Sequence, residues 1–225
     1  MQGDARAQKI SATMRAKGLD NFAAWRERTR WEGRFGRPEV PLGRTEDLAE
    51  FIGLVLGDGN ISVFPRTERL IIACDAKKVR MIRWYADLTQ RLFGKNPTIS
   101  KMKASNCIRI SIYQRGIAER LGIPSGNRSR IFWKLPTWIK KNSNNLCHFL
   151  RGLYEAEGSY SVHTPTYTHK FLFANINISL LDIVFTSLQQ LGFHPHRSRD
   201  KIQLSRKSEI DACMKLLKFR KYDMI

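Results

Sequence analysis

Several features are scarce in this sequence of 225 residues, and each scarcity argues against a class of protein. No run of about 18 apolar residues occurs, so the sequence predicts no membrane-spanning helix. No apolar segment of the secretory type follows the N-terminus, which predicts an intracellular protein, in the cytoplasm or nucleoid or in an organellar matrix. The pattern GxxxxGK[ST] is missing, which excludes phosphoryl transfer at a P-loop.

Cysteine is also scarce. The four cysteines lie far apart in the sequence and form no CxxC pair (Cys74, Cys107, Cys147 and Cys213). This spacing favours neither a structural zinc site nor a disulfide framework. Reduced, mostly buried thiols are expected.

Acidic residues are few beside the basic ones. Twenty Asp and Glu stand against 39 Lys and Arg, which leaves a formal net charge of +19. A surplus of this size is typical of proteins with a polyanionic partner. The basic residues are interleaved with aromatic and apolar ones, as in 130–134, which predicts a folded basic surface. A soluble basic protein without such a partner remains an alternative.

Residues 1–44 are predicted to be a basic N-terminal extension and linker. The pattern indicates an amphipathic helix over 9–30 that is interrupted at Gly18, followed by a cluster of glycine and proline. The segment has too few apolar residues to form a domain alone. We expect it to pack on the rest of the chain through Phe22 and Trp25; a partly disordered tail or an organellar transit peptide are the alternatives.

From Thr45 onward, one succession of elements occurs twice, offset by about a hundred positions. The first repeat is assigned to 45–140 and the second to 141–225. Helices are expected over 45–58, 77–93, 116–121, 145–155, 180–191 and 209–217. Strands are expected over 61–64, 70–74, 108–113, 160–162, 171–178 and 202–204.

The first helix of each repeat has the same design, FIGLVLGDG over 51–59 and LRGLYEAEG over 150–158. Small residues four positions apart lie on one face of each helix, where two helix backbones can approach closely (Gly53 and Gly57; Gly152 and Ala156). If the helices pack along these faces, Asp58 and Glu157 meet at their C-terminal ends.

Two carboxylates in that position repel each other and face the negative ends of both helix dipoles. A divalent cation removes this repulsion, and a nucleic-acid phosphate can complete the coordination of the ion. The pattern therefore predicts a two-metal site for phosphodiester cleavage.

At these residues the sequence resembles the LAGLIDADG homing endonucleases in their single-chain, two-repeat form, over about residues 48–220. The resemblance implies an α+β fold of two pseudo-symmetric αββαββα repeats, whose saddle-shaped antiparallel sheets lie over the DNA major groove. It implies an intron-encoded, monomeric enzyme that binds a long, asymmetric site in double-stranded DNA. It also implies magnesium-dependent cutting of both strands with 3′ overhangs, with Ca²⁺ or Mn²⁺ able to occupy the site.

The resemblance also assigns residues. Asp58 and Glu157 match the catalytic, metal-binding acids, and the preceding Gly57 and Ala156 are included in the expected metal site. The second motif departs from the family pattern in having Glu157 for Asp and Arg151 in a small, apolar stretch. This departure puts equal geometry at the two strands in doubt.

The family places a basic residue near each scissile phosphate. Arg128 and Arg220 match this position loosely, because lysine is commoner there. Both are predicted to be catalytic; residues that only position phosphates are the alternative.

Strand alternation predicts which side chains face DNA. One set is expected to pack inward: Ile61, Val63, Leu70, Ile72, Ile108 and Ile110. Amide, hydroxyl and guanidinium groups on the opposite faces can address base edges. The predicted DNA-binding residues are Asn60, Ser62, Phe64, Arg66, Arg69, Ile71, Lys101, Lys103, Arg109, Ser111, Ser159, Ser161, His163, Asn175, Asn177, Arg197, Arg199, Lys201, Gln203 and Ser205.

Two other functions fit the same scaffold. One is a DNA-binding regulator that does not cut, although loss of either acid would be its hallmark and both acids are present. The other is an intron RNA maturase. An intein is disfavoured, because the sequence has neither an N-terminal Cys or Ser nucleophile nor a terminal His-Asn pair.

Overall fold

The computed structural model describes residues 2–18, 20, 23–31, 40–103, 105–129 and 131–220. It divides into two compact units, Met1–Glu39 and Val40–Ile225. The first unit contains α1 (Gln2–Ala16) and α2 (Ala23–Trp31), so the helix expected over 9–30 is two helices, the first of which ends just before Gly18. Phe22 lies outside the described residues, and the expected packing of this segment through Phe22 and Trp25 stays a prediction.

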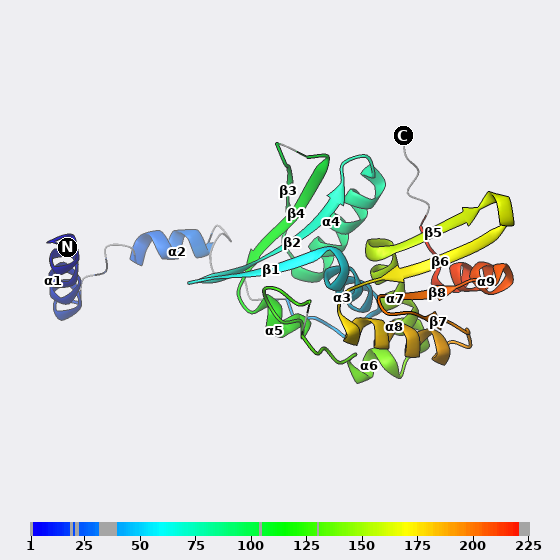
Figure 1. Cartoon of the computed structure of the whole chain (residues 1–225). Coiled ribbons are helices and arrows are strands. Elements are labelled where there is room, and N and C mark those ends of the chain that lie inside the picture. Colours follow the sequence, from blue (N-terminus) through cyan, green and yellow to red (C-terminus); the bar gives the residue numbers. More distant parts are fainter. Residues whose placement is uncertain are drawn as a thin grey trace. The chain divides into compact units, whose positions relative to one another are not determined.

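The second unit runs through the same order of elements twice (Figure 1). The first repeat contains α3 (Glu46–Asp58), β1 (Gly59–Phe64), β2 (Thr67–Asp75), α4 (Val79–Phe93), β3 (Thr98–Lys101), β4 (Cys107–Gln114) and α5 (Ile117–Leu121). The second contains α7 (Ser143–Glu157), β5 (Gly158–His163), β6 (Thr168–Ala174), α8 (Ile178–Gln190), β7 (His196–Arg197), β8 (Lys201–Leu204) and α9 (Lys207–Leu217). A short helix, α6 (Thr137–Lys140), precedes the second repeat, and a 3-10 turn (Thr164–Thr166) joins β5 to β6. The expected αββαββα order is therefore confirmed.

The two sheets have equivalent topologies, β1-β2-β4-β3 and β5-β6-β8-β7, and every neighbouring pair is antiparallel. Figure 1 shows α3 and α7 between the two sheets, with the remaining helices of this unit outside them. No helix in the described part of the chain is both long and apolar enough to cross a bilayer.

The two central helices begin at side-chain caps and lie inside the core. The Thr45 hydroxyl accepts a hydrogen bond from the Leu48 N–H at 3.2 Å, and the Asn142 side chain accepts one from the Asn145 N–H at 3.1 Å. Every residue of α3 from Leu48 to Leu56 is buried. Burial of apolar side chains on all sides of α3 is what fixes it at the centre of the unit.

Two expectations for the strands are wrong. Val63 was expected to pack inward but is 64% exposed, because it lies one residue from the end of β1, an edge strand with a neighbouring strand on one side only. The strand expected over 171–178 ends at Ala174. The Asn177 side chain accepts hydrogen bonds from the N–H groups of Ser179 and Leu180, and this cap begins α8.

Candidate active site

The helices α3 and α7 are in backbone contact along their small residues. A Cβ added to Gly53 would lie 2.1 Å from the Phe149 carbonyl oxygen, and one added to Gly152 would lie 2.1 Å from that of Glu50. Neither position has room for a side chain. The two close contacts are reciprocal, so the helices run side by side with their C-terminal ends together.

The two acids lie at this shared end. A Cβ on Gly57 would meet the Ala156 Cβ at 2.5 Å and the Glu157 Cγ at 3.1 Å. Asp58 is the last residue of α3 and Glu157 is the last of α7. The structure thus brings Asp58, Glu157, Gly57 and Ala156 together, as the paired motifs predicted.

The fold opposes ionisation of both acids. Burial, and next the charge of Glu157, raises the pKa of Asp58 to about 7, while the charge of Lys78 acts in the opposite direction. Burial also raises the pKa of Glu157 above its ordinary value. Carboxylates whose ionised form is disfavoured in this way are found at sites that a bound cation or substrate completes.

The donors present suit a hard divalent cation. Within the described ranges, no three His, Cys, Asp or Glu side chains gather as a metal cage. Magnesium commonly binds through one or two carboxylates and takes its other ligands from water and substrate phosphates. Asp58 and Glu157 would hold the ion, and the roles expected of Gly57 and Ala156 as further ligands stay predictions.

A polar cleft of about 760 Å³ opens beside the acids. It is lined by Leu56, Gly57, Asn60, Ile61, Ser62, Val63, Ser125, Gly126, Asn127, Arg128, Ser129, Glu157, Asn175, Asn177 and Leu180. Hydroxyl, amide and guanidinium groups of this kind donate hydrogen bonds to phosphate oxygens. The cleft therefore has room and donors for a nucleic-acid backbone next to Glu157.

Arg128 is anchored at the end of α3. Its Nη2 donates hydrogen bonds to the carbonyl oxygens of Val55 at 2.8 Å and Gly59 at 2.5 Å. Its Nη1 is buried and has no hydrogen-bond partner in the described part of the chain. Burial lowers the pKa of Arg128. The family resemblance implied that this residue lies near a scissile phosphate, and the structure places it beside the end of α3 that carries Asp58.

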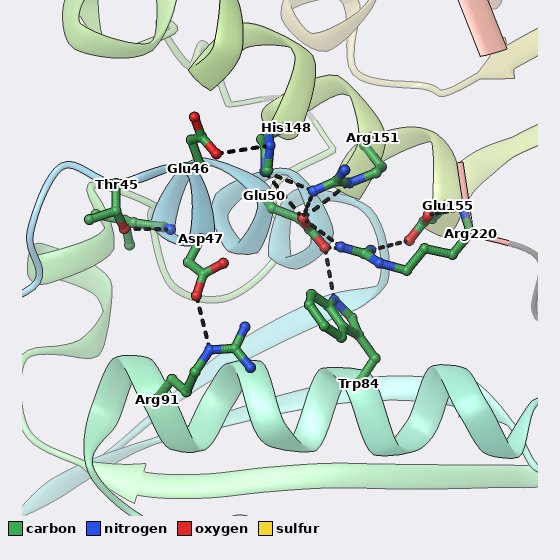
Figure 2. Close-up of polar contacts among 11 residues, drawn as sticks. Thr45, Glu46, Asp47, Glu50, Trp84, Arg91, His148, Arg151, Glu155 and Arg220 are labelled. Carbon is green, nitrogen blue, oxygen red and sulfur yellow. Dashed lines mark hydrogen bonds and ion pairs between the residues drawn. The ribbon is translucent and has the colours of Figure 1, made fainter. Parts of the chain in front are cut away.

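Arg220 lies elsewhere, in a buried ionic cluster that links the repeats (Figure 2). Its Nη2 donates to a Glu50 carboxylate oxygen at 2.9 Å, and its Nη1 donates to Glu155 at 3.0 Å. Its guanidinium carbon is 4.0 Å from the centre of the Trp84 ring. Arg151 also binds Glu50, with its Nε at 3.1 Å.

The predicted catalytic role of Arg220 stays a prediction. In this structure the Glu50 and Glu155 carboxylates hold its guanidinium in the cluster, and Arg220 is not among the residues that line the cleft. Arg151, which departs from the small, apolar pattern, is explained by the same cluster, because it neutralises the fully buried Glu50.

Most of the predicted DNA-binding residues share one face of each sheet. Direct cross-strand partners lie on the same face, and the pairs Asn60–Ile71, Ile71–Ser111 and Ser62–Arg69 place these residues together. By the same register or strand alternation, this face includes Phe64 and Arg109 in the first repeat, and Ser159, Ser161, His163, Lys201, Gln203 and Ser205 in the second. Arg66, Lys103 and Arg199 are exposed in turns, and Asn175 lines the cleft.

Three of the predicted DNA-binding residues point elsewhere. Asn177 is buried, and its amide nitrogen donates to the carbonyl oxygens of Arg128 and Ile131. Arg197 forms an ion pair with Asp182 on α8. Lys101 lies opposite Ile108, on the face that carries the apolar set.

The sequence reasoning missed two kinds of site residue. Lys78, whose charge acts on Asp58, follows β2, and only the hairpin register brings it to the end of α3. Asn127 lines the cleft from a loop without periodicity. The polar run around Arg128 was the one available signal for that loop.

No protein-family model matches the chain. Among solved structures, mesophilic variants of the homing endonuclease I-DmoI align with a TM-score of 0.56 at 17% identity, over 80% of this chain and 99% of that one. I-DmoI in complex with DNA and Mn aligns with a TM-score of 0.56 at 17% identity, over 79% of this chain and 99% of that one. The N-terminal LAGLIDADG domain of DUF199/WhiA aligns with a TM-score of 0.54 at 18% identity, over 81% of this chain and 86% of that one. Together with the repeated topology and the paired central helices, these alignments show that the chain has the two-repeat LAGLIDADG fold.

Proposed function

We propose that this protein is a site-specific, metal-dependent endonuclease that cuts both strands of double-stranded DNA and leaves 3′ overhangs. The observation that carries the proposal is the pair of acids at the adjoining ends of α3 and α7, where burial opposes the charge of both. A divalent cation would stabilise both carboxylates in their charged form.

Each group of the site has a distinct part in this reaction. Asp58 and Glu157 would hold Mg²⁺, or Mn²⁺ or Ca²⁺ in its place, and the packed helix backbones keep the two carboxylates at a fixed separation. The bound ion supplies electrostatic stabilisation of the charge that develops on the phosphodiester. Arg128 lines the cleft from its anchored position beside the end of α3, where its positive charge can attract a phosphate.

The proposed partner is a long, asymmetric site in double-stranded DNA, bound by a monomer. The +19 charge and the two polar sheet faces support this choice. The two repeats present different side chains, so a palindromic site would not match both. I-DmoI, a structural neighbour, is described in complex with DNA and Mn, with DNA and Ca, and with target DNA and Mg.

Incubation with a library of double-stranded DNA targets and Mg²⁺ tests the proposal. The expected result is one class of site broken in both strands with 3′ overhangs, inhibited by a chelator and restored by Mg²⁺ or Mn²⁺. Duplexes that are bound but never cut in either metal would contradict the nuclease and leave a regulator. Preferential binding of folded intron RNA would instead favour a maturase.

A further inference from the structure

The first sheet carries an aromatic–guanidinium cluster on its DNA-facing side. The guanidinium carbon of Arg69 lies 5.4 Å from the centre of the Phe64 ring and 6.0 Å from that of the Tyr113 ring. The two rings are 6.3 Å apart. All three residues lie on the face of Ser62, because Arg69 pairs with both Ser62 and Tyr113.

This packing fixes the direction of Arg69. Its Nε is buried without a hydrogen-bond partner, while Phe64 and Tyr113 remain 41% and 51% exposed. No hydrogen bond or ion pair of Arg69 with another described residue occurs, so its terminal N–H groups are not engaged within that part of the chain. Aromatic rings that pack on the face of a guanidinium leave the N–H donors in its plane available to an external acceptor.

We propose that Arg69 recognises a guanine in the major groove and that Phe64 and Tyr113 are the positioning residues that hold it. The O6 and N7 acceptors of guanine match two parallel guanidinium donors, and no other base presents that pair. The inference rests on the proposed function, since it requires DNA on this face of the sheet.

The strand geometry gives the position of this guanine. Ser62, the partner of Arg69, follows Asp58 by four residues. At about 3.3 Å per residue this is about 13 Å along the strand. With a rise of about 3.4 Å per base pair, the contact falls about four base pairs outward from the phosphodiester beside Asp58.

The second sheet lacks this cluster. Asp58 and Glu157 are equivalent helix ends, so Ser62 corresponds to Ser161, whose partner is Lys170. A lysine carries a compact charge and lacks the planar guanidinium that donates two parallel hydrogen bonds. A guanine contact of this two-donor kind is therefore expected in one half of the site only.

Selection of bound duplexes from a randomised double-stranded DNA library, in Ca²⁺ and at fixed salt, tests this assignment. The wild-type protein should select guanine at one position about four base pairs from the cut. Replacing that guanine with adenine should weaken binding about 5- to 150-fold. The variant Arg69→Ala, which removes both guanidinium donors, should bind DNA with this preference lost.

Further variants separate positioning from general stability. Tyr113→Leu combined with Phe64→Leu should reduce the ratio of guanine to adenine affinity while Arg69 is present, whereas Tyr113→Phe should retain it. Arg83→Lys, at an exposed position of α4 outside the sheet, should leave the ratio unchanged. Melting temperatures measured in parallel show that each variant is folded.

The outcomes distinguish this inference from the proposed function. A duplex that is bound and cut without a guanine preference, or with the preference intact in Arg69→Ala, overturns the inference alone. A preference for thymine at this position also overturns the inference, because the base would then be contacted by the Phe64 and Tyr113 rings and not by Arg69. Failure of the wild-type protein to bind any duplex contradicts both.

Discussion

At the scale of single residues, Asp58 is the side chain whose charge the fold opposes most clearly. Burial and the neighbouring Glu157 raise its pKa to about 7, whereas the pKa of an aspartate in an unfolded chain is about 4. The folded protein therefore binds this proton more tightly than the unfolded chain does. The wild-type protein is expected to lose stability as the pH rises from about 4 to about 7.

Asp58→Asn removes that titration. Without divalent metal at pH 8, the free energy of unfolding of the variant should exceed that of the wild type. The difference should be roughly 1–3 kcal/mol after allowance for partial solvent screening. The difference should nearly vanish at pH 4. Chemical denaturation in a chelator at both pH values measures it, and an equal difference at both values would argue against a buried, opposed carboxylate.

The pKa of Glu50 is shifted in the opposite direction to that of Asp58. Burial alone would raise its pKa, but hydrogen bonds from His148 and Arg220 and the charges of Arg220 and Arg151 hold that pKa well below its usual range. A lowered folded pKa stabilises the protein above the unfolded pKa of about 4.3, and this stability is lost as the pH falls.

Glu50→Gln should therefore lower the free energy of unfolding by about 3–5 kcal/mol at pH 7, because it leaves the buried Arg151 without a counter-charge and removes one of the two carboxylates that bind Arg220. The loss should be smaller at pH 3. The matched control is Glu46→Gln: Glu46 contacts His148 and its side chain is 49% exposed, so the change should cost less than about 1 kcal/mol. A similar loss for both variants would contradict the special role of Glu50.

The sequence predicted the position of those site residues whose neighbours are set by a recognisable motif. Asp58, Glu157 and Arg128 come together because helix ends and the loop after the first repeat are set by local patterns. The cluster around Arg220 could not be predicted, because its partners Glu50, Trp84 and Glu155 lie 65 or more positions away and share no periodicity with it.

At the scale of elements, the contact between α3 and α7 depends on glycine. Gly53→Ala should destabilise the protein by about 1–3 kcal/mol or more, because the added carbon would meet a backbone carbonyl oxygen that cannot move alone. The cleavage rate should fall by more than the loss of folded protein explains, since displacement of an acid by about 1 Å can lower the rate about 100-fold.

Thermal unfolding and cleavage rates measured on the same samples test this expectation. Gly43→Ala is the control, because its added carbon would meet only the Thr45 methyl at 3.5 Å. That change should alter stability by less than about 0.5 kcal/mol. Unchanged unfolding in Gly53→Ala would show that the helices are not in backbone contact.

The long helices were predictable, because their apolar periodicity extends over several turns and ends at a cap or a glycine. The short elements β3, β7 and α6 were not, since two to four residues carry no period. The overlong strand at 171–178 has a physical reason. Its apolar alternation continues through Ile176 and Ile178, which are 77% and 66% exposed, but the Asn177 cap starts a helix there.

At the scale of the whole molecule, charge dominates the expected binding. With a net charge of +19 and two sheet faces against DNA, on the order of 6–10 phosphate contacts are expected. DNA affinity should then fall by about 10³–10⁵ between about 50 and 200 mM salt. Titration of a labelled duplex at several salt concentrations gives the slope, and a flat response would mean that the surplus charge does not contact DNA.

The most direct test of the central claim is a paired measurement of DNA binding and double-strand cleavage for Asp58→Asn and Glu157→Gln. Each change removes one carboxylate charge of the proposed metal site and lies outside the strands of the two sheets. Both variants should bind the selected duplex within a few-fold of the wild-type affinity and fail to cut both strands in Mg²⁺. Double-strand cutting at the wild-type rate by either variant would contradict the assignment of the paired acids as the catalytic metal site.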